Sequence, residues 1–119
     1  MEYKVIFHID ETVKWGMVLG NVENLLAAAG TVPITIEVLA NGEAVGMYAA
    51  GKDSAGTDNA FIQRMASLHE KGVAFAACRN AMRANRLTDN DLAGFVVPVP
   101  AGVMELVERQ AQGYGYIKP

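Results

Sequence analysis

The sequence contains a single cysteine, which excludes an intramolecular disulfide and a Cys-x-x-Cys redox pair. Aromatic residues make up only 8% of the chain, so a hydrophobic core must be mainly aliphatic. The net charge is -3 and no dense basic run occurs, which gives no electrostatic reason to expect nucleic-acid binding. No apolar run approaches membrane-spanning length, and no signal-peptide pattern precedes the first predicted strand. We therefore expect no membrane association and a cytoplasmic location, where a lone thiol stays reduced.

Metal-binding and phosphate-binding residue patterns are also scarce. His8, His69 and Cys78 fall in three separate elements without a short chelating spacing, so we expect no metal site. The acidic pair Asp10-Glu11 follows the first strand, where a flavin or nucleotide phosphate needs backbone amides, glycines and hydroxyl groups. Two carboxylates there would repel phosphate. We expect no cofactor.

Segments typical of strands alternate with amphipathic segments along the whole chain, and no repeat or linker divides it. The predicted strands cover residues 4–9, 33–40, 73–78, 95–99 and 114–117. Helices are expected over 13–29, 43–50 and 59–71, and after residues 78 and 101. This alternation predicts one α/β domain over residues 1–119, with a parallel sheet covered on both faces. Thr35 and Glu37 alternate with apolar residues, which predicts an edge or near-edge place for the second strand. Residues 51–56 read as a loop.

The short helix after residue 78 carries arginines at spacings of four and three. Arg79, Arg83 and Arg86 are therefore expected on one helix face, which is either solvated or binds an anionic group. The last helix is expected to bury an apolar side formed by Val103, Leu106 and Val107.

Cys78 lies where an apolar strand ends and a helix begins. The carboxyl ends of strands in an open α/β sheet form its ligand crevice. The positive end of a helix dipole there favours thiolate over thiol, and the thiolate is the nucleophile. Cys78 is therefore a candidate catalytic residue that solvent reaches at least in part. The alternative is a small buried hydrophobe, as free cysteines often are.

Three further polar residues belong to the same predicted rim. His8 ends the first strand, Asn41 follows the second, and Asn80 lies just after Cys78, so all three are candidate substrate-binding residues. If the strand order is 2-1-3-4-5, His8 and Cys78 end neighbouring strands, and His8 would assist proton transfer. The alternative for His8 is a tucked-in strand histidine with one hydrogen bond.

Six short motifs, in their order and spacing, resemble those of the DsrE/DsrF-like proteins with the YchN-like fold, a family of small intracellular sulfur-oxidation and sulfur-relay proteins. The motifs are VIFHID at 5–10, GNVENLL at 20–26, IEVLANG at 36–42, FAACRN at 75–80, VPAGVMEL at 99–106 and QAQGY at 110–114. Together they span nearly the full length.

The resemblance implies a flavodoxin-like three-layer α/β/α sandwich with a mainly parallel sheet of about five strands, and homotrimers or homohexamers. It also implies that Cys78 occupies the position that carries persulfide sulfur in the sulfur-relay members. The leading hypothesis is thus a persulfide carrier with sulfurtransferase-like chemistry, served by sulfur donor and acceptor proteins. The alternative is a non-catalytic oligomeric module that binds a small ligand or a protein partner in the same crevice, with Cys78 only packing.

Overall fold

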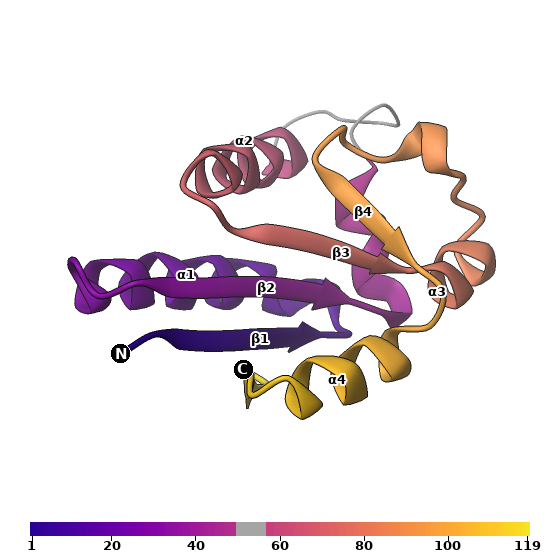
Figure 1. Cartoon of the computed structure of the whole chain (residues 1–119). Coiled ribbons are helices and arrows are strands. Elements are labelled where there is room, and N and C mark those ends of the chain that lie inside the picture. Colours follow the sequence, from indigo (N-terminus) through magenta and orange to yellow (C-terminus); the bar gives the residue numbers. More distant parts are fainter. Residues whose placement is uncertain (50–56) are drawn as a thin grey trace.

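The five apolar segments form one parallel sheet (Figure 1). A computed structural model describes residues 1–49 and 57–119, so the loop expected at 51–56 lies outside the described residues. The strands are β1 (Tyr3–Ile9), β2 (Ile34–Ala40), β3 (Ala74–Cys78), β4 (Val96–Val99) and β5 (Gly115–Ile117). Their order in the sheet is β4-β3-β2-β1-β5, and every neighbouring pair is parallel. The parallel sheet expected from the sequence is confirmed.

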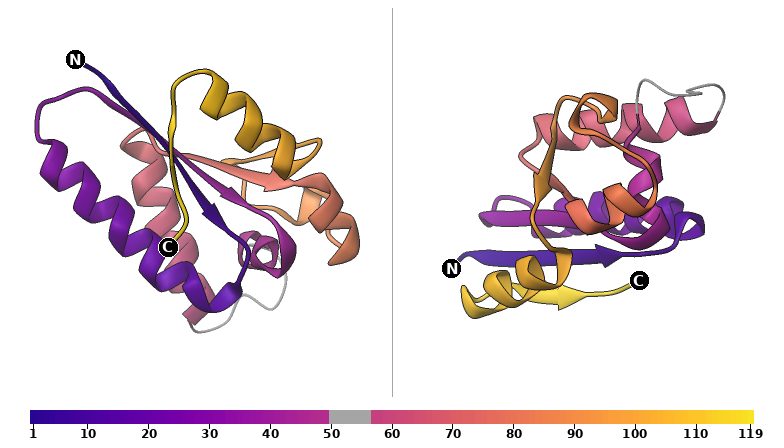
Figure 2. Two further views of the ribbon diagram at one scale, coloured as in Figure 1. Left: turned by 90° about the horizontal axis from the view of Figure 1, so that it is seen from below. Right: turned by 90° about the vertical axis from the view of Figure 1, so that its right-hand side faces the viewer.

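Helices cover both faces of this sheet, as Figure 2 shows. The α-helices are α1 (Trp15–Ala29), α2 (Thr57–Glu70), α3 (Arg79–Ala84) and α4 (Gly102–Ala111), and the 3-10 helices are η1 (Thr12–Lys14), η2 (Gly42–Tyr48) and η3 (Asp89–Asp91). Helices α1 and α2 pack on one face, and α4 packs on the other over β2 and β5. The expected three-layer sandwich is therefore confirmed. No helix in the described ranges is long and apolar enough to cross a membrane.

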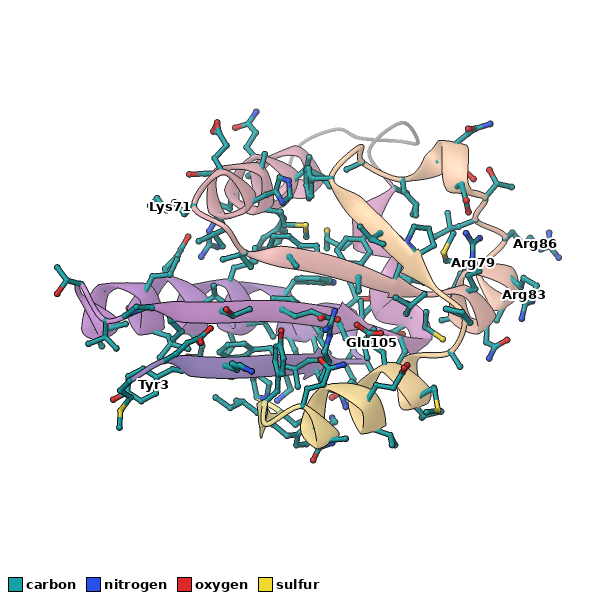
Figure 3. All side chains as sticks on the ribbon, in the orientation of Figure 1. Tyr3, Lys71, Arg79, Arg83, Arg86 and Glu105 are labelled. Carbon is teal, nitrogen blue, oxygen red and sulfur yellow. The ribbon has the colours of Figure 1, made fainter. Side chains whose placement is uncertain are left out.

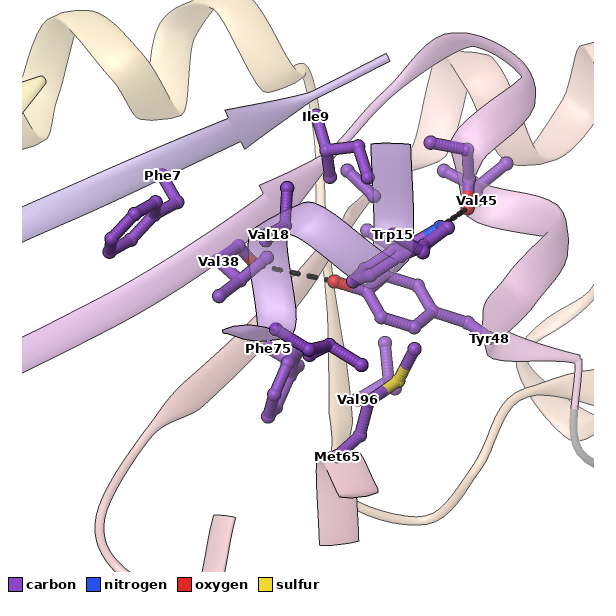
Figure 4. Close-up of a cluster of buried hydrophobic side chains, with 14 of the residues drawn as sticks. Phe7, Ile9, Trp15, Val18, Val38, Val45, Tyr48, Met65, Phe75 and Val96 are labelled. Atoms are coloured by element: carbon purple, nitrogen blue, oxygen red, sulfur yellow. Dashed lines mark hydrogen bonds between the residues drawn. The ribbon is translucent and has the colours of Figure 1, made fainter. Parts of the chain in front are cut away.

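The main core lies under α1 and α2, and three of its aromatic rings, those of Trp15, Tyr48 and Phe75, lie together (Figure 4). Trp15 and Tyr48 meet edge to face at 5.3 Å between ring centroids, and Tyr48 meets Phe75 at 6.3 Å. The Trp15 Nε1–H group donates to the Ala44 carbonyl at 3.0 Å, and the Tyr48 hydroxyl donates to the Val38 carbonyl at 3.3 Å. These bonds fix η2 against the sheet and so position the turn that follows β2.

The opposite core, under α4, is smaller. Its buried members are Ile6, Leu39, Ala76 and Leu106. The expectation that α4 also buries Val103 and Val107 is wrong, because they are 67% and 58% exposed. In the described part of the chain α4 is the only helix on this face, so no second helix covers them.

The expected edge position of β2 is also wrong, because β2 is the middle strand of the five. Its alternating polar residue Glu37 is only 3% exposed and accepts a hydrogen bond from Arg109 Nε at 2.8 Å. A polar residue alternating with apolar ones usually faces solvent. Here it faces α4, whose arginine supplies the partner.

Candidate functional site

The strand order separates His8 from Cys78. The conditional order 2-1-3-4-5 is wrong, since β2 lies between β1, which carries His8, and β3, which ends at Cys78. The chain adds β2, β3 and β4 successively on one side of β1 and places only β5 on the other. The direction of winding therefore switches between β1 and β5. As a result Asn41, directly after β2, lies next to Cys78 in place of His8.

A pocket of about 490 Å³ opens at the carboxyl ends of the strands. It contains three of the four predicted site residues, Cys78, Asn41 and Asn80, whereas His8 does not line it. The lining residues are Asp10, Asn41, Gly42, Cys78, Asn80, Ala81, Ala84, Asn85, Ala101, Gly102 and Val103. The pocket thus opens at the edge of the sheet where the carboxyl-end rule places a ligand crevice.

Cys78 lies in this pocket with 6% of its surface exposed. It is the N-cap residue of α3, and Ala101, the N-cap residue of α4, lines the same pocket. Neither N-cap makes a side-chain hydrogen bond to the first turn of its helix. The side chains of these two N-cap residues therefore do not occupy the backbone N–H groups of the first turns, and such groups favour negative charge nearby. This arrangement suits an anionic sulfur.

Gly102, the first residue of α4, allows the close approach of three elements. A Cβ atom at this position would lie 3.2 Å from the Cys78 Cβ, and 3.4 Å from both the Asn41 Cβ and the Asn41 Nδ2. Only a residue without a side chain leaves this contact unstrained. The sequence analysis did not select Gly102 as a site residue, and its one signal was a glycine at the start of the predicted last helix.

We expect Gly102→Ala to push α4 away from Cys78 and Asn41. Overpacking of this kind costs about 1–3 kcal/mol of stability, and the rate of Cys78 alkylation by iodoacetamide should change several-fold because the pocket wall moves. Gly20→Ala is the matched control, because a Cβ at residue 20 meets nothing within 4 Å. Similar alkylation rates for the Gly102→Ala variant and the wild type would show that this contact does not shape the site.

His8 lies beside the pocket and is hydrogen-bonded through both ring nitrogens. Its Nδ1 is 2.7 Å from the Tyr116 hydroxyl, and its Nε2 is 3.0 Å from Asn41 Oδ1. This is one hydrogen bond more than the tucked-in strand histidine of the sequence analysis. Tyr116 was not predicted, because its contact with His8 depends on the placement of β5 beside β1.

Only two of the three arginines labelled in Figure 3, Arg79 and Arg83, belong to α3. Arg79 makes two hydrogen bonds to Asp89, at 2.7 and 3.1 Å, and Arg83 donates to Asn80 Oδ1. Arg86 lies beyond the end of α3, in the left-handed region with φ of 59°. The expected cationic face is therefore limited to Arg79 and Arg83, and both have hydrogen-bond partners.

Charge inside the pocket is nearly balanced. Asp10 is the one charged residue among its described lining residues, and Lys118 Nζ lies 3.2 Å from Asp10 Oδ1. In the described parts of the chain, no three His, Cys, Asp or Glu side chains are grouped so that they could hold a metal ion.

The fold and the pocket define a small, parallel α/β protein with one cysteine at the carboxyl end of an inner strand. The profile of the DsrE/DsrF-like family matches residues 19–119, and the chain belongs to this family. A protein of unknown function from Methanobacterium thermoautotrophicum, MTH1491, has a similar structure with a TM-score of 0.84 and 32% sequence identity, covering 98% of this chain and 99% of that one. The YchN protein of E. coli is 14% identical with a TM-score of 0.72 over 100% of both chains, a likeness of fold alone. No protein with a curated description matches the sequence.

Proposed function

We propose that the protein carries sulfur as a persulfide on Cys78. The observation that carries this proposal is the position of Cys78, in a pocket of about 490 Å³ between the uncapped starts of α3 and α4. Membership of the DsrE/DsrF-like family supports a role in sulfur relay. A carrier needs one reactive thiol and no resolving cysteine, and the sequence contains one cysteine.

The transfer is a thiol exchange at the outer sulfur of a persulfide. The Cys78 thiolate attacks the outer sulfur of a donor R–S–SH, a new S–S bond forms, and the bond between the two donor sulfurs breaks. The donor leaves as the thiolate R–S⁻, and Cys78 holds the outer sulfur as Cys–S–SH. An acceptor thiolate then attacks that sulfur in the same way and releases the Cys78 thiolate. No external oxidant or reductant is consumed, and the reducing cytoplasm is the compartment that suits such a carrier.

The pocket residues have separate parts in this proposal. The backbone N–H groups at the starts of α3 and α4 stabilise the thiolate before attack and the persulfide anion after it. Asn41 and Asn80 line the space that the incoming sulfur occupies. His8 is not assigned a proton-transfer role, because it does not line the pocket and both of its nitrogens have partners.

Intact-mass measurement after incubation with glutathione persulfide tests this proposal. We expect one added sulfur atom per chain, located at Cys78 by peptide mapping and removed by dithiothreitol. The alternative of a non-catalytic binding module is favoured by one observation, the 6% exposure of Cys78. Failure to load sulfur, together with slow alkylation of the native protein near neutral pH, would support that alternative and contradict the carrier.

We further propose that the chain assembles into a homotrimer or homohexamer. Several large apolar side chains on the α4 face are more than half exposed: Val97, Val103, Met104 and Val107. Parallel sheets are normally covered on both faces, but on this face Ala74 of β3 is exposed as well. Contacts between subunits would remove this surface from water.

Sedimentation velocity at micromolar concentration is expected to show the oligomer. The double variant Val103→Lys with Val107→Lys should shift the protein toward the monomer, because charged ammonium groups would have to be buried at the contact. Lys replacements at Met17 and Val13, which are exposed apolar positions near the start of α1, provide the matched control. A wild-type monomer at these concentrations would contradict the proposal.

A further inference from the structure

We propose that a hydrogen-bonded chain from Tyr116 through His8 orients the side-chain amide of Asn41, so that its NH2 group faces Cys78 and selects substrates with an anionic group. In this arrangement Asn41 is a binding residue, and His8 and Tyr116 are positioning residues. The substrate class rests on the proposed function, whereas the orientation of the amide does not.

The hydrogen-bond pattern determines what each group donates. Asn41 Oδ1 is only an acceptor, so the His8 Nε2 that lies 3.0 Å from it carries a hydrogen. In a neutral ring Nδ1 is then the acceptor, and the Tyr116 hydroxyl, 2.7 Å away, donates to it. In a protonated ring Nε2 still donates to Oδ1, and Tyr116 becomes the acceptor. With the Nε2–H tautomer, Asn41 keeps its oxygen toward His8 whether the ring is neutral or protonated.

The other end of the amide lies beside Cys78. Asn41 Nδ2 is 3.4 Å from the position that a Cβ on Gly102 would take, and the Cys78 Cβ is 3.2 Å from the same position. Within the described residues, Nδ2 makes no hydrogen bond to the protein, while both residues line the pocket. An amide N–H group stabilises an anion and does not give up its proton. The NH2 group is thus an available donor at the place where a sulfur anion would form.

Strand β5, which pairs with β1, brings Tyr116 into contact with His8. Tyr116 pairs with Ile6 in the parallel ladder between β5 and β1, and Lys118 reaches Asp10 at 3.2 Å. Asp10 lines the pocket, and its negative charge would repel an anion there, so its ion pair with Lys118 reduces that repulsion. All three residues of β5 are exposed. This short strand and the residue after it therefore contribute hydrogen bonds and an ion pair to the site, and little buried surface.

A matched pair of alkylating reagents tests the orientation directly. Iodoacetate carries a carboxylate and iodoacetamide is its neutral analogue of nearly equal size. The ratio of their rate constants with Cys78 reports a donor for the anion, whereas general loosening of the pocket raises both rates. We expect Asn41→Leu to lower the iodoacetate-to-iodoacetamide ratio on the order of tenfold, the usual effect of one hydrogen bond to a charged group.

Tyr116→Phe removes one hydroxyl and should lower the same ratio several-fold, because His8 then no longer holds the amide in one orientation. Tyr114→Phe is the matched control: it lies in the same segment, and its ring packs near Arg109 and Lys4. Equal ratios in the Tyr116→Phe and Tyr114→Phe variants would overturn the positioning role, and a wild-type ratio in Asn41→Leu would overturn the donor. A wild type that reacts with neither reagent would overturn both.

The outcome is separable from that of the carrier proposal, since neither reagent supplies sulfur. If the variants show the expected ratios but the protein takes up no sulfur from glutathione persulfide, the proposed amide orientation is supported and the carrier function is contradicted. If the protein loads sulfur but the ratios are unchanged in every variant, the carrier function is supported and the proposed amide orientation is contradicted.

Discussion

Replacing Cys78 with serine or alanine is expected to abolish sulfur loading completely while the protein still folds. The proposed chemistry passes through a bond to the Cys78 sulfur, and no second cysteine in the chain can replace it. Serine and alanine are close to cysteine in size, so neither forces the wall of the pocket to move. Intact mass after incubation with glutathione persulfide measures the loading, and thermal unfolding measures the fold.

The relative stability of the serine and alanine variants shows whether the side chain at residue 78 is buried away from water. Cys78 is 6% exposed and belongs to the main hydrophobic cluster. A hydroxyl without a partner in such a place costs about 1–3 kcal/mol. Alanine leaves only a small void and should cost less. Serine equal to alanine would indicate that the pocket hydrates this position.

Ala84→Ser is the matched control for these variants, because Ala84 lines the same pocket and the change adds a hydroxyl group without touching the sulfur. It should load sulfur like the wild type. A serine variant clearly less stable than the alanine variant, combined with a wild type that takes up no sulfur, would refute the carrier and leave Cys78 as a packing residue.

The elements of this fold were predictable because they depend on local patterns. Apolar runs of strand length and amphipathic segments of helix length follow one another, and the positive φ of Gly30 after α1 suits the glycine found there. The order of the strands was not predictable in this way, because it depends on which way each crossover turns. The place of β2 was missed for a related reason: the partner of Glu37 is Arg109, 72 residues away.

The same distinction applies to the candidate site. Cys78, Asn41 and Asn80 follow strands, and the rule that ligands bind at carboxyl ends places them in the pocket. Tyr116 and Gly102 are brought to the site by tertiary contacts. Tyr116 meets His8 across 108 residues of sequence, through the pairing of β5 with β1. No pattern in the residues around Tyr116 indicates this contact.

The cluster of Glu37, Glu105 and Arg109 leads to a prediction on stability. Arg109 Nε lies 2.8 Å from Glu37 Oε1 and 3.2 Å from Glu105 Oε2, so two carboxylates share one guanidinium group. Burial, followed by the hydrogen bond and the charge of Glu105, raises the pKa of Glu37 to about 8, although Arg109 acts in the opposite direction. Among the described residues Glu37 Oε2 has no hydrogen-bond partner. A proton on Glu37, donated toward Glu105, would satisfy this oxygen and remove the repulsion between the two carboxylates.

Wild-type stability is therefore expected to fall as the pH rises from about 5 to 8. In this range the folded protein keeps a proton on Glu37, with a pKa of about 8, while the unfolded chain, whose glutamates titrate near the ordinary value of 4.5, has released it. The free energy of unfolding then falls by up to about 1.4 kcal/mol per pH unit, and this decline ends above the folded pKa.

Glu37→Gln removes the carboxyl group that takes up this proton but keeps a side-chain oxygen that can accept the hydrogen bond from Arg109. Urea unfolding at pH 5, 6, 7 and 8 gives the free energy of unfolding as a function of pH, and this profile should be flatter for the variant than for the wild type. The contributions of groups that titrate equally in both proteins drop out when the two profiles are subtracted. Glu23→Gln is the control, since Glu23 is half-exposed, paired with Arg64, and has its pKa lowered, mainly by the hydrogen bond from Arg64, so that it stays ionised throughout this range. Parallel profiles for the wild type and Glu37→Gln would mean that Glu37 is already ionised at pH 5. Arg109 would then outweigh both burial and the charge of Glu105.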